Sequence, residues 1–304
     1  MDKILQVNNL KKHFEHIKAV DDISFYVEKG KLFAFLGPNG AGKSTTIDII
    51  CTFLKPDSGT VIIDGNVLGK DDDKIRSSIG VVFQDGFLDD LLTVEENIKY
   101  RGSFYGLKGP ELQAAFARVV EATGIKEFLK RQYKKLSGGQ KRRADIARAL
   151  IHTPKILFLD EPTTGLDPQT RKKVWETILN MQRESNMTVF MTTHYMEEAS
   201  EADYVIIIDN GKIAARGTPY ELRRNHAHDS LRIETSDVEA VEAILKSQNL
   251  SFKHHNGEII IPLEKTIDAL TILEVCKPHL LNFEVLSGTL DDAFINITGR
   301  EIRE

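Results

Sequence analysis

Residues 32–50 read LFAFLGPNGAGKSTTIDII. The first five residues of this stretch are all apolar, which predicts a parallel strand buried on both faces of a sheet. A glycine-rich turn follows, and the residues from Ser44 to Phe53 predict a helix. A buried strand, a glycine turn and a helix in direct succession indicate an α/β fold.

The turn between this strand and this helix fits the phosphate-loop pattern G-x-x-x-x-G-K-[ST]. Glycines allow backbone torsions that turn successive N–H groups toward phosphate oxygens, and the helix N-terminus adds partial positive charge. Lys43 can reach the terminal phosphates, and the Ser44 hydroxyl can hold Mg²⁺. A glycine turn with an incidental lysine is the alternative, but the position between a buried strand and a helix favours phosphate binding. The candidate nucleotide-binding residues are Gly37, Pro38, Asn39, Gly40, Ala41, Gly42, Lys43, Ser44 and Thr45.

A second apolar strand is predicted at 156–159, and it ends in the carboxylates Asp160 and Glu161. Ligands of open α/β sheets bind at the carboxyl ends of the strands. Asp160 is therefore predicted to hold Mg²⁺, directly or through water, because hard cations favour oxygen ligands. Glu161 is predicted to orient and deprotonate the attacking water. Acidic residues that merely leave a strand for solvent are the alternative.

A third motif is Leu136-Ser137-Gly138-Gly139-Gln140. Ser137 and Gln140 form the pattern of a capping box, so a helix is predicted to begin here and to run toward Pro154. Two glycines in its first turn leave backbone N–H groups open to a phosphate, although a flexible loop before a helix would look similar. This second phosphate-binding terminus lies 95 residues from the first (138 − 43). The separation suggests that two copies of the chain share one nucleotide.

The rest of the chain predicts a P-loop NTPase core with two additions. A period-two alternation of residues at 23–28 predicts an antiparallel β subdomain, and helical patterns over about 85–150 predict an inserted helical subdomain. The first domain is predicted to span 1–225. Residues 229–304 predict a small α+β accessory domain with the ferredoxin-like order βαββαβ and a hairpin at Asn256-Gly257.

Composition limits the class of partner. The net charge of −5 gives no electrostatic case for nucleic acid, and Cys51 and Cys276 are too few for a disulfide framework or a metal cluster. The N-terminal residues lack the apolar region of a secretory signal, and the apolar runs are far shorter than a membrane span. We therefore expect a cytoplasmic protein, and any membrane-spanning part must belong to another chain.

Residues 1–225 resemble the ATP-binding cassette (ABC) ATPases, and the pentapeptide at 136–140 is the most specific mark of this resemblance. Further matches are Gln84 in Val-Val-Phe-Gln, Asp167 in Gly-Leu-Asp-Pro and His194 in Met-Thr-Thr-His. The resemblance implies that Gln84 senses Mg²⁺ and the lytic water, that Asp167 lies at a dimer seam, and that His194 contacts the γ-phosphate. It also implies a head-to-tail dimer, homodimeric or pseudo-symmetric, that sandwiches two ATP molecules with Mg²⁺.

Three further features bear on this resemblance. Phe14 stands where the family often places an aromatic residue on adenine, and stacking and plain packing remain equally open. Asp145 stands where such ATPases more often carry an apolar residue. A basic cluster reads as a solvated helix flank or a lipid-headgroup contact rather than a nucleic-acid site; it comprises Lys134, Lys135, Lys141, Arg142 and Arg143.

The C-terminal stretch Thr289-Leu-Asp-Asp-Ala-Phe resembles the tail of exporter-type subunits, the branch with antibiotic and multidrug resistance pumps. We therefore expect an ATPase that powers a separate membrane permease from the inner face of the cell membrane, exporting drugs, antibiotics or lipid-like compounds. An importer ATPase and a soluble ABC ATPase acting on ribosomes or DNA are the alternatives. The permease is expected to dock after Gln84, on the apolar residues Phe87, Leu88, Leu91 and Leu92.

Overall fold

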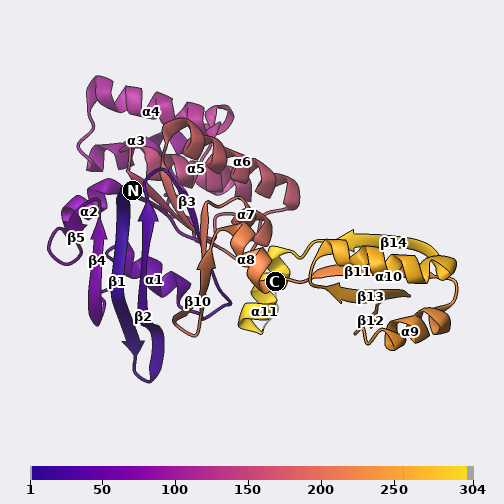
Figure 1. The fold of residues 1–304 in the computed structure, drawn as a ribbon. Coiled ribbons are helices and arrows are strands. Elements are labelled where there is room, and N and C mark those ends of the chain that lie inside the picture. Colours follow the sequence, from indigo (N-terminus) through magenta and orange to yellow (C-terminus); the bar gives the residue numbers. More distant parts are fainter. Residues whose placement is uncertain (1, 256, 300–304) are drawn as a thin grey trace. The chain divides into compact units, whose positions relative to one another are not determined.

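The computed structural model describes residues 2–255 and 257–299, and the chain divides into two compact units, Met1–Arg216 and Gly217–Glu304 (Figure 1). The boundary therefore lies before the predicted end of the first domain at 225. Its physical reason is the helix α8 (Pro219–His226), which packs on α11 (Leu290–Thr298) within the second unit.

The first unit is built on a six-stranded sheet with the order β10-β9-β3-β8-β7-β6. Neighbouring strands from β9 to β6 pair in parallel, so their carboxyl ends meet at one edge. The bounds are β3 (Leu32–Leu36), β6 (Ile79–Val82), β7 (Ile156–Asp160), β8 (Thr188–Thr193), β9 (Tyr204–Asp209) and β10 (Lys212–Gly217). Because β3, β7 and β8 are adjacent, the residues that follow them are brought together.

Helices flank this sheet at α1 (Lys43–Ile50), α2 (Asp72–Ser78), α6 (Pro168–Ser185) and α7 (Met196–Ser200). The helix α1 begins at Lys43 and ends at Ile50, before the predicted limit at Phe53. Thr52 adopts a positive φ of 70°, a left-handed conformation that cannot continue a right-handed helix.

The amino-terminal residues of the unit form an antiparallel sheet with the order β2-β1-β4-β5. Its strands are β1 (Lys3–Phe14), β2 (Ile17–Glu28), β4 (Ser58–Ile63) and β5 (Asn66–Val67). The alternation predicted for β2 is present, since Ile23, Phe25 and Val27 are buried. The ring of Phe25 lies 5.7 Å from that of Phe33 on β3, so one apolar core joins the two sheets.

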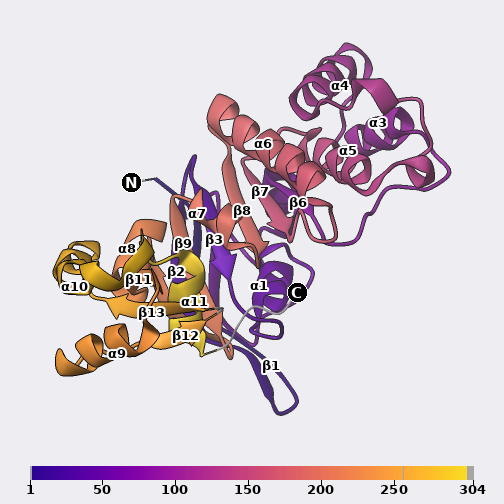
Figure 2. The same cartoon turned by 90° about the vertical axis from the view of Figure 1, so that its right-hand side faces the viewer.

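Between β6 and β7 the chain forms the helices α3 (Val94–Phe104), α4 (Gly109–Thr123) and α5 (Gly138–Leu150). These helices contact one another and lie together in Figure 2. The short 3₁₀ helices η1 (Lys126–Phe128) and η2 (Tyr133–Lys135) lead from α4 into α5. This insertion carries the pentapeptide of residues 136–140 at the N-terminus of α5.

The second unit holds a four-stranded antiparallel sheet with the order β12-β13-β11-β14. Its elements follow the chain as β11 (Asp229–Thr235), α9 (Val238–Ser247), β12 (Lys253–His255), β13 (Glu258–Leu263), α10 (Ala269–Cys276) and β14 (Leu280–Leu286), with the 3₁₀ helices η3 (Thr266–Asp268) and η4 (Lys277–His279) on either side of α10. Of the predicted hairpin pair, Gly257 has a φ of 87°, as a tight turn requires, while Asn256 lies outside the described residues.

Candidate functional site

The glycine loop after β3 is packed against neighbouring backbone. Gly40 and Gly42 have φ values of 80° and 106°, which favour glycine. A Cβ at Gly42 would lie 2.1 Å from the Ala19 carbonyl oxygen, and a Cβ at Gly37 would lie 2.4 Å from that of Ile208. The loop therefore needs glycine both for its torsions and for its close approach to β2 and β9.

The Lys43 side chain is buried and folds back over this loop. Its Nζ donates to the carbonyl oxygens of Gly37 at 2.7 Å and Pro38 at 3.3 Å. Burial lowers the pKa of Lys43, while the nearby carboxylates of Glu161 and Asp160 act in the opposite direction. A cation is thus held inside the turn, where a phosphate group would enter.

The other residues of the loop are also in place to line a phosphate site. The Ala41 backbone N–H donates to the Pro38 carbonyl oxygen at 3.1 Å, which closes the turn. Asn39 is exposed, and so is Ser44 in the first turn of α1, while Thr45 is half-buried. The Ser44 hydroxyl is therefore open to a ligand at the N-terminus of α1.

Asp160 ends β7 with a buried carboxylate. Its Oδ1 accepts a hydrogen bond of 2.5 Å from the Thr192 hydroxyl on β8. Burial raises the pKa of Asp160, as does the charge of Glu161, and the Thr192 hydrogen bond and the cations Lys43 and Arg142 oppose that rise. A carboxylate is thus held next to the loop cation, where a divalent ion would offset the electrostatic cost of burying its charge.

Glu161 has a positive φ of 46°, which is uncommon for a residue other than glycine. Its backbone N–H donates to the carbonyl oxygen and hydroxyl of Thr192 at 3.2 and 3.0 Å. Its Oε2 accepts from Thr164 at 3.1 Å and lies 3.4 Å from His194 Nδ1. The His194 hydrogen bond lowers the pKa of Glu161 although burial raises it. The strained backbone and these partners aim an anionic carboxylate at the sheet edge.

Glu198 is a buried carboxylate that sequence reasoning missed. It accepts hydrogen bonds from the Thr163 hydroxyl and, at 2.7 Å, from the Thr193 hydroxyl. Thr163 follows Glu161 and Thr193 precedes His194, so Glu198 ties together the two loops that carry those residues. Thr163 lies 35 residues from Glu198 in sequence, and neither spacing nor periodicity indicates that the two side chains meet.

Gln84 is exposed just beyond β6, and its backbone is held by an arginine of α5. Arg142 donates to the carbonyl oxygens of Phe83 at 2.5 Å, Gln84 at 3.3 Å and Glu161 at 3.1 Å. The assignment of Arg142 to a solvated basic cluster was wrong, because its side chain is buried. The prediction failed because the pattern of charges along α5 does not reveal that backbone carbonyl groups of the core face Arg142.

The pentapeptide begins α5 with the expected capping box. Gln140 Oε1 accepts from the Ser137 backbone N–H at 3.1 Å, and Ser137 Oγ accepts from the Gln140 backbone N–H at 3.4 Å. Leu136 is buried under this cap. Within residues 2–255 and 257–299, no described hydrogen bond or ion pair joins this terminus to the Lys43 loop.

The two glycines of the pentapeptide face the first turn of α6 and the segment before it. A Cβ at Gly139 would lie 2.1 Å from Thr170 Cγ2, and a Cβ at Gly138 would lie 3.1 Å from Leu166 Cδ2. Asp167 caps α6 by accepting from the Thr170 backbone N–H at 3.0 Å, and it is exposed. Close packing on α6 therefore favours glycine at position 139, in addition to any contact with phosphate, whereas a Cβ at Gly138 would meet only the end of the Leu166 side chain.

Phe14 ends β1 in a hairpin tip opposite Ile17. Its side chain is 45% exposed, and Lys12 Nζ lies 5.5 Å from its ring centroid. The ring is therefore not part of the buried core, which leaves it open to a planar ligand.

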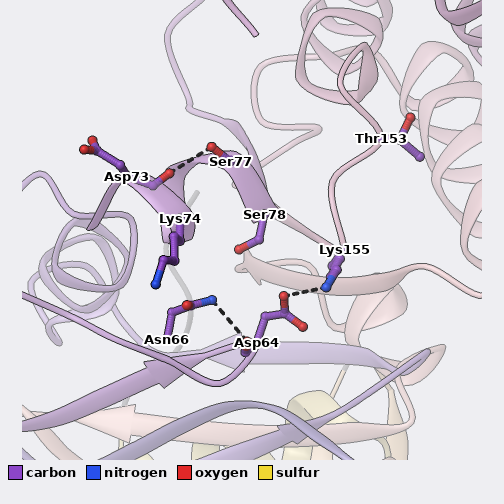
Figure 3. A pocket seen from close by; sticks show the side chains of 8 residues that line it. All are labelled: Asp64, Asn66, Asp73, Lys74, Ser77, Ser78, Thr153 and Lys155. Carbon is purple, nitrogen blue, oxygen red and sulfur yellow. Dashed lines mark hydrogen bonds and ion pairs between the residues drawn. The ribbon is translucent and has the colours of Figure 1, made fainter. Parts of the chain in front are cut away.

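A polar hollow of about 460 Å³ lies apart from these groups, between the β4–β5 turn, α2 and the loop before β7 (Figure 3). Its lining residues are Asp64, Asn66, Asp73, Lys74, Ser77, Ser78, Thr153 and Lys155. Lys155 lies 2.6 Å from Asp64, and Lys74 lies 2.9 Å from Asp71, so both cations are paired. We assign no nucleotide chemistry to this hollow.

The donor set at the sheet edge fits a magnesium–nucleotide complex. Ser44 and Asp160 offer hydroxyl and carboxylate oxygens beside the loop cation Lys43. Across the described residues, no group of three or more His, Cys, Asp or Glu side chains could hold a metal ion. Mg²⁺ normally keeps several waters and binds through one or two protein ligands plus phosphates, and Ser44 and Asp160 could supply those ligands.

A phosphate loop on β3, carboxylates at the end of β7 and a histidine after β8 define a P-loop nucleoside triphosphatase. Residues 20–164 match the family described as ABC transporter. The chain is 38% identical to the linearmycin resistance ATP-binding protein LnrL of Bacillus subtilis, over 99% of this chain and 100% of that protein. It is 34% identical to the daunorubicin/doxorubicin resistance ATP-binding protein DrrA of Streptomyces peucetius, over 98% and 93%. The chain therefore belongs to the ATP-binding proteins of ABC transporters, and it is an ATPase.

Solved structures agree with this family. The dimeric post-hydrolysis cassette MJ0796 bound to ADP and Pi matches with a TM-score of 0.63 and 31% identity, over 70% of this chain and 98% of that one. The CbiO1 subunit from Clostridium perfringens matches with a TM-score of 0.67 and 29% identity, over 81% and 96%. The predicted P-loop fold class is thus confirmed. None of the helices in the part of the chain that the structure describes could span a membrane.

Proposed function

We propose that this chain is the motor subunit of an exporter, in which two ATPase chains power a separate membrane permease on its cytoplasmic side. The observation that carries the proposal is the meeting of Lys43, Asp160 and Glu161 at one sheet edge, while the signature pentapeptide lies on another subdomain. The relatives named for drug and antibiotic resistance align over nearly their whole length, which favours an exporter over an importer or a soluble ABC ATPase.

Each residue at the edge then has a role in hydrolysis. The loop of residues 37–44 cradles the phosphates of ATP, with Lys43 toward the terminal ones. Ser44, Asp160 and Gln84 would hold Mg²⁺, which neutralises phosphate charge when bound. Glu161 takes the proton of the attacking water, because its carboxylate is anionic and is aimed by Thr164 and His194.

The complete site is shared between two chains. Ser137, Gly138 and Gly139 of one chain are proposed to close on ATP held by the phosphate loop of the other, with Asp167 at the seam. The exposed Ser137, Gly138 and Asp167 support this, because all three are open on the surface of the first unit. A homodimer and a pseudo-symmetric heterodimer both fit, and Phe14 is a candidate to stack on adenine.

The permease is proposed to dock on an aromatic surface beside the Gln84 segment. Phe87 and Leu91 are 65% and 67% exposed, and Phe53 is 65% exposed. The rings of Phe53 and Phe87 each lie 5.2 Å from that of Phe83, so these three rings form one patch, and the exposed Leu91 follows four residues after Phe87. An exposed patch of this kind marks an interaction site.

Replacing Phe87 and Leu91 by serine tests this docking surface. We expect the double variant to keep its ATPase activity within about two-fold, since neither side chain contacts the phosphate loop, and to lose the permease from detergent co-purification. Leu281→Ser, at an exposed apolar residue of the second unit, is the matched control and retains the permease. Undiminished co-purification of the double variant would place docking elsewhere.

The second unit is proposed to be an accessory domain that nucleotide binding does not need. A chain ending at Gly217 is expected to bind ATP with a Kd within about two-fold of the full chain, because the loop, carboxylate and histidine residues all precede the boundary. A chain ending at Asn225 is expected to be less soluble, since Leu222 loses its cover on α11, an apolar burial worth roughly 1.5–3 kcal/mol. Loss of ATP binding in a folded chain ending at Gly217 contradicts this independence.

A further inference from the structure

Four polar side chains are buried together where the helical insertion meets the core. They are Tyr133, Arg142, Asp145 and Arg148, each less than 9% exposed. Burial of ionised groups is costly unless hydrogen bonds and opposite charges compensate for lost water. None of these residues belongs to the phosphate loop or the carboxylate pair, so their burial needs another reason.

Tyr133 and Asp145 form the centre of this cluster. The Tyr133 hydroxyl donates to Asp145 Oδ2 at 2.8 Å, while Oδ1 is buried without a hydrogen-bond partner among the described residues. Burial raises the pKa of Asp145, and the Tyr133 hydrogen bond and the charges of Arg148 and Arg142 oppose that rise. An apolar residue at position 145 would avoid this cost but would leave two buried guanidinium groups without their nearest carboxylate.

The segment after Gln84 rests directly on this pair. A Cβ added at Gly86 would lie 2.1 Å from the Tyr133 hydroxyl oxygen and 3.3 Å from Asp145 Oδ2. Gly86 does not have a positive φ, so space alone accounts for glycine here. The hydroxyl of Tyr133 therefore acts as a stop against which the backbone of the segment lies.

Arg142 holds the same segment from its other side. Asp145 lies one helical turn beyond Arg142 on α5, and Arg142 donates to the carbonyl oxygens of Phe83, Gln84 and Glu161. Arg148 adds a hydrogen bond of 2.7 Å to the Val81 carbonyl oxygen. The face of α5 that carries Arg142 and Arg148 therefore hydrogen-bonds both to β6 and to the backbone of Glu161.

We propose that Tyr133, Asp145 and Arg142 are positioning residues that hold the 83–87 segment and the Glu161 backbone in register with the signature helix. The proposal rests on the hydrolytic roles proposed above for Gln84 and Glu161. It explains why a carboxylate stands at position 145, and it links the docking surface at Phe87 to the hydrolytic site through one rigid contact.

Asp145→Asn tests this role in the full chain, since it removes the charge at nearly constant volume. We expect kcat for ATP to fall by about ten-fold or more, with KM within about two-fold, because misplacing a reacting group lowers turnover more than binding. Amide exchange over residues 83–87 is expected to become about ten-fold faster. Thr123→Val is the matched control, a buried polar residue of the same insertion whose hydroxyl bonds only within α4; it lowers Tm without changing kcat.

The contact itself is tested by combining Gly86→Ala with Tyr133→Phe. Each single change is expected to accelerate exchange of the segment, and the double variant is expected to be less impaired than the sum, because Tyr133→Phe removes the atom with which the new Cβ collides. Strictly additive effects, or an Asp145→Asn protein with unchanged exchange or kcat, overturn the proposal. Amide exchange is measured in the absence of ATP hydrolysis, so it tests the positioning contact alone. The proposed catalytic role of Glu161 is tested separately, by the ATPase rate of Glu161→Gln.

Discussion

Glu161→Gln is expected to lower the turnover of ATP by about 10²-fold or more while ATP binding remains. Glutamine keeps the shape of the side chain and can accept from Thr164, but it cannot take a proton from water. Glutamate and glutamine at position 161 both have to adopt the same positive φ. The substitution therefore changes the side-chain chemistry and leaves the backbone strain in place. Loss of the carboxylate charge is the difference that the assay measures.

The same variant is expected to accumulate ATP-bound dimers, because closed sites are no longer opened by hydrolysis. Single-turnover hydrolysis and size-exclusion chromatography with ATP measure the two effects. Glu197→Gln, at an exposed carboxylate of α7, is the matched control and is expected to behave as wild type. A Glu161→Gln protein that hydrolyses ATP at a near wild-type rate would remove the residue from the mechanism.

The core of the site could be predicted because its parts carry local signals. The apolar run of β3, the glycine loop and Lys43 are contiguous in sequence, so a single segment fixes strand, turn and helix. Asp160 could be placed because it directly follows a buried strand, and parallel strands bring their carboxyl ends to one edge. The capping box at Ser137 and Gln140 is likewise a short-range pattern with its own geometry.

The groups that support the site could not be predicted in this way. Glu198 of α7 joins Thr163, in the loop after β7, to Thr193 at the end of β8, and the contact with Thr163 depends on how these segments pack. The left-handed backbone of Glu161 likewise depends on its contacts with Thr192 on the neighbouring strand β8. Arg142 was misjudged because basic residues on a helix usually face water, whereas here the core supplies three carbonyl acceptors.

The boundary between the two units lies after Arg216 rather than at the predicted residue 225, for a related reason. Residues 219–226 follow the last strand of the first unit and carry a helix signal, but no local pattern shows which unit covers them. Leu222 is buried and α8 contacts α11, so this helix belongs with the C-terminal residues. Contacts between segments far apart in sequence decide such boundaries.

Two inactive variants are expected to restore each other when they are mixed. Lys43→Ala removes the loop cation but keeps the signature, and Ser137→Arg obstructs the start of α5 but keeps the phosphate loop. Each homodimer then has two defective sites and is nearly inactive, with turnover reduced about 10²-fold or more. In a mixed dimer both defects fall in one site, so the other site is whole.

Measuring activity alone is not sufficient, because a mixed dimer with one whole site would stay inactive if hydrolysis required both sites to be intact. ATP-dependent crosslinking across the intact site answers it, with a cysteine at Asp167 in the Lys43→Ala variant and a cysteine at Asn39 in the Ser137→Arg variant, both exposed positions. Mixing a variant with itself under the same conditions is the control for nonspecific association. Crosslinking that requires ATP and both variants reports the shared site whether or not turnover returns.

The mixed dimer therefore tests most directly whether two chains build each ATP site. If they do, mixing restores ATPase activity up to roughly a quarter of the wild-type level, since half of the dimers are mixed and each has one intact site. ATP-dependent crosslinking then appears in the mixture and is absent from either variant alone. If neither activity nor ATP-dependent crosslinking appears, each chain builds its own complete site and the two-chain motor is contradicted.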